Sequence, residues 1–96
     1  MRKNNEVSIA DALEAMLKEL KLKSRLDETR VQTIWRERMG KSISTYTSEI
    51  SVRKKTLYLT ILSAPLKQEL SYSKEKIIEL MNREMGDGFI EEVVIQ

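Results

Sequence analysis

The chain has 96 residues, of which 33% are charged, 41% hydrophobic and 5% aromatic, and its net charge is +2. This length supports a single globular domain, and the composition is that of a folded, soluble protein. The sequence contains no cysteine and no histidine, which excludes disulfides, thiol nucleophiles, Ser-His-Asp triads and metal sites built on either residue, and we expect no cofactor.

A first helix is predicted to follow a flexible arm over residues 1–7, with residues 8–96 forming one domain. Ser8 and Asp11 resemble a capping box at its start. Behind them, apolar residues recur at the spacing of one helix face, which predicts a buried stripe; these residues are Ile9, Leu13, Met16, Leu17 and Leu20. The basic run Lys21–Arg25 is interpreted as a connector.

A second helix is predicted from the N-cap residue Asp27 to Gly40, with Leu26 and Val31 as a hydrophobic staple. Its buried side consists of Val31, Ile34, Trp35 and Met39. Trp35 lies on this stripe, so we interpret it as a packing residue and not as a platform for stacking bases.

The period of the apolar residues then changes from 3.6 to 2, which predicts a β-hairpin over residues 50–62 with Lys54 and Lys55 at its turn. Ser63 and Pro65 begin a predicted helix that runs to Met85 and stops at Gly86. A final strand, residues 90–95, is expected to lie parallel to a hairpin strand through a right-handed crossover. The resulting fold class is α+β in the order ααββαβ, a three-stranded mixed sheet with helices on one face.

The charges are distributed unevenly along the chain. Residues 1–55 contain 13 Lys/Arg against 8 Asp/Glu, whereas residues 56–96 contain 4 against 7. Two basic clusters in the first half are candidates for contacting phosphates, although solvated surface charge explains them equally well. The candidate nucleic-acid-binding residues are Lys21, Lys23, Arg25, Arg30 and Arg36, together with Arg53, Lys54 and Lys55 at the hairpin tip.

A second candidate site lies on the sheet face away from the main stripe. Tyr58, Leu62 and Val94 fall on that face by the strand alternation. An uncovered apolar patch there is typical of a protein-interaction or homodimer site, and a minor core beneath the N-terminal arm is the alternative. The chain is not expected to be an enzyme, because the carboxylates of Asp87, Glu91 and Glu92 have no nucleophile or base beside them.

The segment Trp35–Ile43 resembles the W-x-x-h-h-G-x-x-I signature of the DciA-like family. Residues 56–61, the Glu69-Leu70 pair and Leu80–Asn82 continue the resemblance, which covers roughly residues 8 to 96. Arg38 stands where the family has an apolar residue, and Leu66 where it often has tryptophan. The resemblance implies a KH-like domain of a bacterial, cytoplasmic protein that acts with the replicative DNA helicase.

Two functions remain open at this point. The first is a replication accessory that binds single-stranded or forked DNA and a helicase. Because the only glycines are Gly40, Gly86 and Gly88, the G-x-x-G clamp of ordinary KH domains is missing and binding must be electrostatic. The second is a protein-interaction or homodimeric adaptor without nucleic-acid binding. No apolar run approaches the roughly 20 residues of a membrane span, so no membrane partner is expected.

Overall fold

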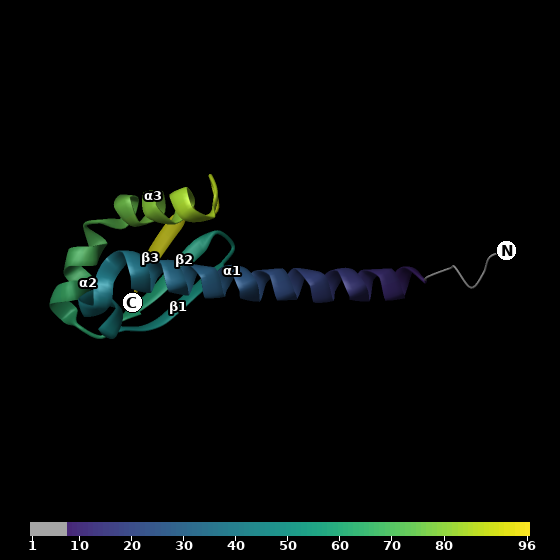
Figure 1. The fold of residues 1–96 in the computed structure, drawn as a ribbon, viewed down its shortest axis with the longest axis horizontal. Coiled ribbons are helices and arrows are strands. Elements are labelled where there is room, and N and C mark those ends of the chain that lie inside the picture. The colour runs from purple at the N-terminus through teal and green to yellow at the C-terminus, as the bar shows by residue number, and fades with distance from the viewer. Residues whose placement is uncertain (1–7) are drawn as a thin grey trace.

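The computed structural model describes residues 8–96, and the predicted arm over residues 1–7 lies outside the described residues. The elements follow one another as α1 (Ile9–Thr45), β1 (Thr47–Arg53), β2 (Thr56–Ile61), α2 (Ala64–Ser71), α3 (Lys74–Met85) and β3 (Glu92–Ile95) (Figure 1). The α+β class is confirmed. The observed order, αββααβ, differs from the predicted ααββαβ in both helical regions.

α1 is helical without a break from Ile9 to Met39, where two helices were predicted, and a short last turn follows the non-helical Gly40. The predicted end of the second helix at Gly40 is therefore confirmed. α1 starts as expected, with the Ser8 hydroxyl accepting a hydrogen bond from the Asp11 amide at 3.0 Å. The prediction of a connector at Lys21–Arg25 was wrong, because this segment has no Gly or Pro and consists mostly of good helix formers. Asp27 was also wrong as an N-cap: its carboxylate pairs with Lys23 one turn earlier at 2.9 Å.

Gly40 kinks α1 near its C-terminal end. Its φ of 89° and ψ of 170° lie in a region that is essentially reserved for glycine. The chain then makes a last helical turn to Thr45 before it enters β1. The kink therefore turns the chain back so that β1 can pack beside the helix that precedes it, and α1 and β1 are in contact.

The three strands form a mixed sheet in the order β1-β2-β3. β1 and β2 are antiparallel, with Ile50 opposite Leu59, and β2 and β3 are parallel, with Leu57 beside Val93. The prediction that the last strand lies parallel to a hairpin strand is therefore confirmed. Lys54 and Lys55 form the hairpin turn with φ of 49° and 62°, the left-handed geometry of a type I′ turn.

The predicted single helix from Ser63 to Met85 is two helices, α2 and α3, separated by a turn at Tyr72 and Ser73. Its two ends are as predicted. The Ser63 hydroxyl caps α2 by accepting a hydrogen bond from the Leu66 amide at 3.3 Å, and α3 ends at Gly86. The break lets both short helices contribute to one core, because Leu70 of α2 and Ile77 of α3 are both buried.

A single core lies between the helices and one face of the sheet. Trp35 is fully buried at its centre, which agrees with its interpretation as a packing residue. Arg38, which sits on the same helix, avoids burial by pairing with Glu84 of α3 at 2.7 Å, where both side chains are partly exposed. The buried hydrophobic residues are Val31, Ile34, Trp35, Leu57, Leu59, Ile61, Leu70, Ile77, Met81, Ile90 and Val93.

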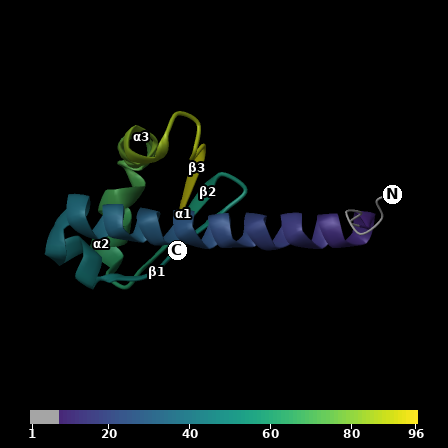
Figure 2. The ribbon, with the colours of Figure 1, turned by 45° about the vertical axis from the view of Figure 1, so that its right-hand side comes forward.

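The first half of α1 projects away from this core (Figures 1 and 2). The molecule is 66 Å long but only 24 and 20 Å across, and the buried residues of α1 begin at Val31. The predicted staple between Leu26 and Val31 is therefore wrong, since Leu26 is 58% exposed. The stripe of Ile9, Leu13, Met16, Leu17 and Leu20 was expected to be buried, and all five side chains are exposed.

Candidate nucleic-acid interface

The hairpin tip is a cationic turn whose backbone is tied to a neighbouring segment. Lys54 and Lys55 hold left-handed backbone conformations that residues other than Gly, Asn or Asp seldom adopt. The carbonyl of Lys55 accepts a hydrogen bond from the Glu91 amide at 2.8 Å, which ties the turn to the segment before β3. The guanidinium of Arg53 lies 4.7 Å from the centre of the Tyr58 ring, a cation–π contact that orients its charge. The turn backbone is therefore well defined, and it presents the side chains of three neighbouring cations to solvent.

A groove of about 620 Å³ separates this tip from α1. Lys23 and Ser24 line it from the helix, and the tip lines it from the other side. We call it the basic groove; it is lined by Leu20, Lys23, Ser24, Asp27, Val52, Arg53, Lys54, Lys55 and Phe89. Its rim carries Lys23, Lys54 and Lys55 against one carboxylate, that of Asp27, and its apolar lining comes from Leu20, Val52 and Phe89. Arg53 also lines the groove, but its guanidinium is turned to the Tyr58 ring on the other face of the sheet.

The structure brings together four of the eight predicted nucleic-acid-binding residues in this groove. Lys23 joins Arg53, Lys54 and Lys55 although about 30 residues separate them in the sequence. Two of these four residues form ion pairs with acidic side chains. Lys23 pairs with Asp27 at 2.9 Å, and Lys55 lies 3.6 Å from Glu91 with both side chains more than half exposed. Exposed pairs of this kind are weak, so the ammonium groups remain available to an anion.

The other four predicted residues lie elsewhere on α1. At 100° per residue, Lys21, Arg25 and Arg36 share one side of the helix, roughly opposite Lys23. Arg30 lies on the same side as Lys23, seven residues further on, and donates to the Glu84 carbonyl at 3.5 Å. The sequence cluster is therefore split by the helix into two rows, and only the row with Lys23 faces the hairpin tip.

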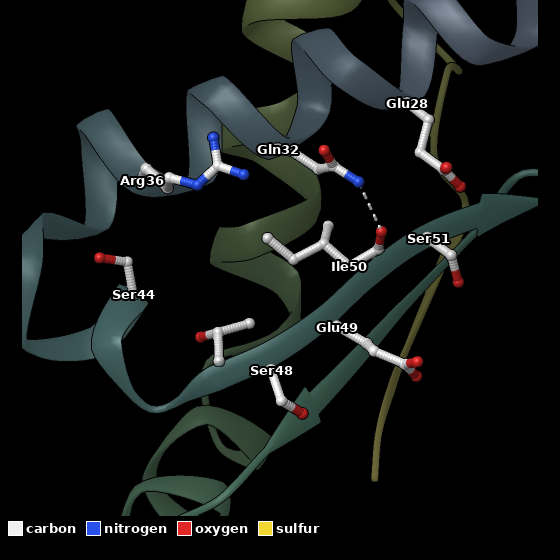
Figure 3. Close-up of a pocket in the computed structure, with 9 residues that line it drawn as sticks. Glu28, Gln32, Arg36, Ser44, Ser48, Glu49, Ile50 and Ser51 are labelled. Carbon is white, nitrogen blue, oxygen red and sulfur yellow. Dashed lines mark hydrogen bonds between the residues drawn. The ribbon is translucent and has the colours of Figure 1, made fainter.

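Arg36 faces a second hollow, of about 440 Å³, between α1 and β1 (Figure 3). This hollow is where α1 covers the outer edge of the sheet. Gln32 donates to the Ile50 carbonyl at 3.1 Å, and the Glu28 carboxylate accepts from the Val52 amide at 3.2 Å. These side chains satisfy backbone groups that an edge strand leaves unpaired. The two carboxylates in the lining, Glu28 and Glu49, make it a poor site for phosphate.

The predicted protein-interaction residues are only partly brought together. Tyr58 and Val94 are neighbours across the β2–β3 pair and both are half-buried on the face away from the core. Leu62 lies beyond the end of β2 and is 67% exposed. We call these three residues the outer sheet face. Because Arg53 also covers part of the Tyr58 ring, this surface is mixed in character and not purely apolar.

Sequence reasoning missed Phe89 as a groove residue. Phe89 follows Gly88 and precedes the predicted last strand. The alternation of apolar and polar residues in that strand therefore gave no indication of its position. Asn82 of α3 positions this segment with two hydrogen bonds to Ile90, from its amide nitrogen to the carbonyl at 3.0 Å and from the Ile90 amide to its oxygen at 2.8 Å. The only sequence signal was the presence of the chain's single phenylalanine beside a glycine turn.

Within residues 8–96, no group of three or more carboxylates is placed to hold a metal ion. No helix in that range is both long enough and apolar enough to cross a membrane. The described chain is thus defined by a small α+β core, a cationic groove and a projecting helix.

This combination defines a small α+β domain with a projecting helix and a groove that has a cationic rim. A family model described as Dna[CI] antecedent, DciA, matches residues 8–95, and the chain belongs to the DciA family. The resemblance stated from the Trp35–Ile43 motif is thereby confirmed. The family is related to helicase loaders, which places the chain in general among accessory proteins of DNA replication. No curated protein and no solved structure matches the chain significantly.

Proposed function

We propose that this protein binds single-stranded DNA in the basic groove, without sequence preference, as an accessory of the replicative helicase in the bacterial cytoplasm. The observation that carries the proposal is the meeting of Lys23 with Arg53, Lys54 and Lys55 around one groove. Three ammonium groups around one groove, with the Arg53 guanidinium on the other face of the same hairpin, suit the closely spaced phosphates of a nucleic-acid strand. Membership of the DciA family supports the link to replication.

Binding should be weak and dominated by phosphate contacts. The groove has one partly buried aromatic residue, Phe89, which also packs on the core, so stacking contributes little. Non-specific electrostatic binders have dissociation constants of about 10⁻⁴–10⁻⁶ M at physiological salt, and we expect a value in that range. Lys21, Arg25 and Arg36, on the opposite side of α1, add only to the surrounding field.

The KH-like relationship that the resemblance implies is part of the proposal. It is supported by the hairpin, the following helices and the parallel last strand. The groove would then replace the missing G-x-x-G clamp as the phosphate-binding feature.

The test is fluorescence anisotropy of a labelled oligothymidylate across a series of salt concentrations. Removing one phosphate-binding cation should reduce the slope of log K against log salt by about 0.7 for a single strand. We expect Lys54→Glu/Lys55→Glu to weaken binding at least tenfold and to reduce the slope by about 1.4. The matched control is Lys74→Glu/Lys76→Glu, which makes the same change in net charge on exposed residues of α3.

Equal weakening in the two variants would mean that only net charge matters and would reject the groove as the site. Undetectable binding by the wild-type protein at low salt would favour the alternative function, a protein-interaction adaptor. The observation in favour of that alternative is the outer sheet face, where Tyr58 and Val94 adjoin and Leu62 is exposed. An apolar contact with a partner there would depend little on salt.

A further inference from the structure

The projecting part of α1 carries an apolar stripe that lies outside the core. The stripe consists of Ile9, Leu13, Met16, Leu17 and Leu20, and each of these side chains is more than half exposed. At 100° per residue it lies on the same side of α1 as the buried residues Val31 and Ile34. The stripe therefore continues the core-facing side of the helix beyond the point where the sheet ends.

A helix in this situation requires a partner for physical reasons. Most helical stability in proteins comes from packing of an apolar face, and the stripe on the projecting part of α1 has no such packing among the described residues. Contiguous exposed apolar surface on a soluble protein also marks an interaction site. Leu22 is also 55% exposed, but it lies on the opposite side of the helix from Leu13 and does not belong to the stripe.

The spacing of the stripe is that of a coiled-coil seam. Ile9, Leu13, Met16 and Leu20 are separated by four, three and four residues, the alternation that places side chains at the a and d positions of heptads. Leu17 lies beside the seam on one side. Nearer the N-terminus, the small residues Ala10 and Ala12 lie on either side of the seam. Small and apolar flanks allow a second helix to approach closely.

The charge distribution and the position of the core indicate which partner helix fits and in which direction. Residues 8–17 contain two acidic and no basic residues, whereas residues 18–25 contain four basic and one acidic residue. These charges lie mostly at b and f positions, away from the seam, so across a helix pair they act as a general field and not as ion pairs. A parallel partner helix would have to continue past Leu20 along the side of α1 that the core occupies. In antiparallel orientation the partner helix ends beside Leu20, and the acidic half of each helix lies near the basic half of the other, which is favourable.

We propose that the projecting segment of α1 pairs with the same segment of a second copy of this chain, in antiparallel orientation. In the register that fills the seam, Leu13 of one helix packs against Met16 of the other, and Ile9 against Leu20. The outer sheet face takes no part in this contact, and both small domains lie at opposite ends of the paired helices. Leu20 also lines the basic groove, so the helix pair ends at the mouth of that groove.

The oligomeric state tests the proposal directly. We expect sedimentation equilibrium of the full chain to show a monomer–dimer equilibrium, and Leu13→Asp to weaken dimerisation at least tenfold. The matched control is Leu22→Asp, which introduces the same charge at an equally exposed leucine on the opposite side of the helix and should leave the dimer intact. Leu13 is outside the core, so both variants should keep the cooperative unfolding of the wild type.

A wild-type chain that is monomeric up to millimolar concentration would overturn the proposal. So would equal dimerisation of the Leu13→Asp and wild-type proteins, which would place the contact elsewhere, such as on the outer sheet face. A loss of dimerisation on nuclease treatment would likewise overturn it, because nucleic acid and not the stripe would then join the two copies.

Orientation is tested by disulfide formation, since the natural chain has no cysteine. We expect a mixture of Ile9→Cys and Leu20→Cys proteins to form the mixed disulfide under mild oxidation. Ile9→Cys alone should form little disulfide, because the two cysteines would lie about 16 Å apart along the helix pair. Efficient cross-linking of Ile9→Cys to itself would show a parallel pair and would overturn the antiparallel assignment.

Discussion

The indole Nε1 of Trp35 donates a hydrogen bond to the hydroxyl of Thr47 at 3.0 Å. Thr47 in turn donates to the carbonyl of Ile43 at 2.9 Å. The fully buried tryptophan is thereby connected to the first residue of β1 across the kink at Gly40. These two consecutive hydrogen bonds hold the indole ring in the core. They also hold the start of β1 next to the last turn of α1.

We expect Thr47→Val to destabilise the protein by about 1–2 kcal/mol, because it leaves the buried indole N–H without an acceptor while preserving the shape of the side chain. Chemical denaturation followed by circular dichroism measures this difference. The control is Thr45→Val, which removes an exposed hydroxyl bound to the Lys41 carbonyl and should change stability by less than about 0.5 kcal/mol. Equal effects of the two variants would contradict the role of Thr47.

Gly40→Ala should cost about 1–3 kcal/mol, the strain of a side chain in this backbone conformation. The reason is the φ of 89° alone, since a Cβ atom at this position would meet no other atom within 4 Å. Ser42→Ala, two residues later on the exposed side of the last turn, is the control and should be nearly neutral. An unchanged free energy of unfolding for Gly40→Ala would show that the kink is not needed.

Replacing Lys54-Lys55 by Asn-Gly should stabilise the hairpin and weaken DNA binding in the same variant. Lysine in a left-handed conformation costs roughly 1 kcal/mol per residue, and Asn-Gly is the favoured pair for a type I′ turn. A gain of about 1 kcal/mol raises the melting temperature of a domain this size by roughly 4–8 °C. A variant that is more stable and binds the oligonucleotide as tightly as the wild type would remove these lysines from the site.

Asn82→Ala should destabilise the protein by about 1–3 kcal/mol, because it removes both partners of the Ile90 backbone groups. The same variant should also weaken DNA binding moderately, since the adjacent Phe89 lines the basic groove. Arg83→Ala, an exposed neighbour on α3, controls for general effects of truncation. The two readouts are thermal unfolding and the anisotropy titration described above.

The local signals in the sequence correctly predicted most of the elements. Alternation of apolar and polar residues identified the hairpin and the last strand. Ser63 and Gly86 marked the two ends of the second helical region. Trp35 was correctly assigned to the core. These features depend on residues close together in the chain, where side-chain period and backbone preference are decisive. The break at Tyr72 and Ser73 was missed because neither Gly nor Pro marks it.

The continuity of α1 and the exposure of its stripe were not predictable in the same way. An apolar face at helical spacing shows that a helix has one side to bury, but the partner is a property of tertiary structure or of another chain. Asp27 is a residue type that caps helices, yet inside a helix with Lys23 four residues before it the same side chain forms an ion pair instead.

The candidate groove was only half predictable for a related reason. Lys54 and Lys55 are adjacent in sequence and stay together at the tip. Lys21 and Lys23 are almost adjacent too, yet a helix places them about 200° apart. Phe89 reaches the groove only through the parallel pairing of β3 with β2, which no local pattern contains.

The uninterrupted course of α1 from the core into its projecting half has a consequence for avidity. In the antiparallel pair proposed above, about 33 helical residues separate the two copies of Val31, a span of about 50 Å. The pair would be a bivalent binder with a stiff spacer, so its effective affinity would depend on whether one DNA molecule reaches both grooves. A duplex strand advances about 3.4 Å per nucleotide, so about 15 nucleotides cover that span. A forked or double-stranded substrate shorter than this would reach only one of the two grooves.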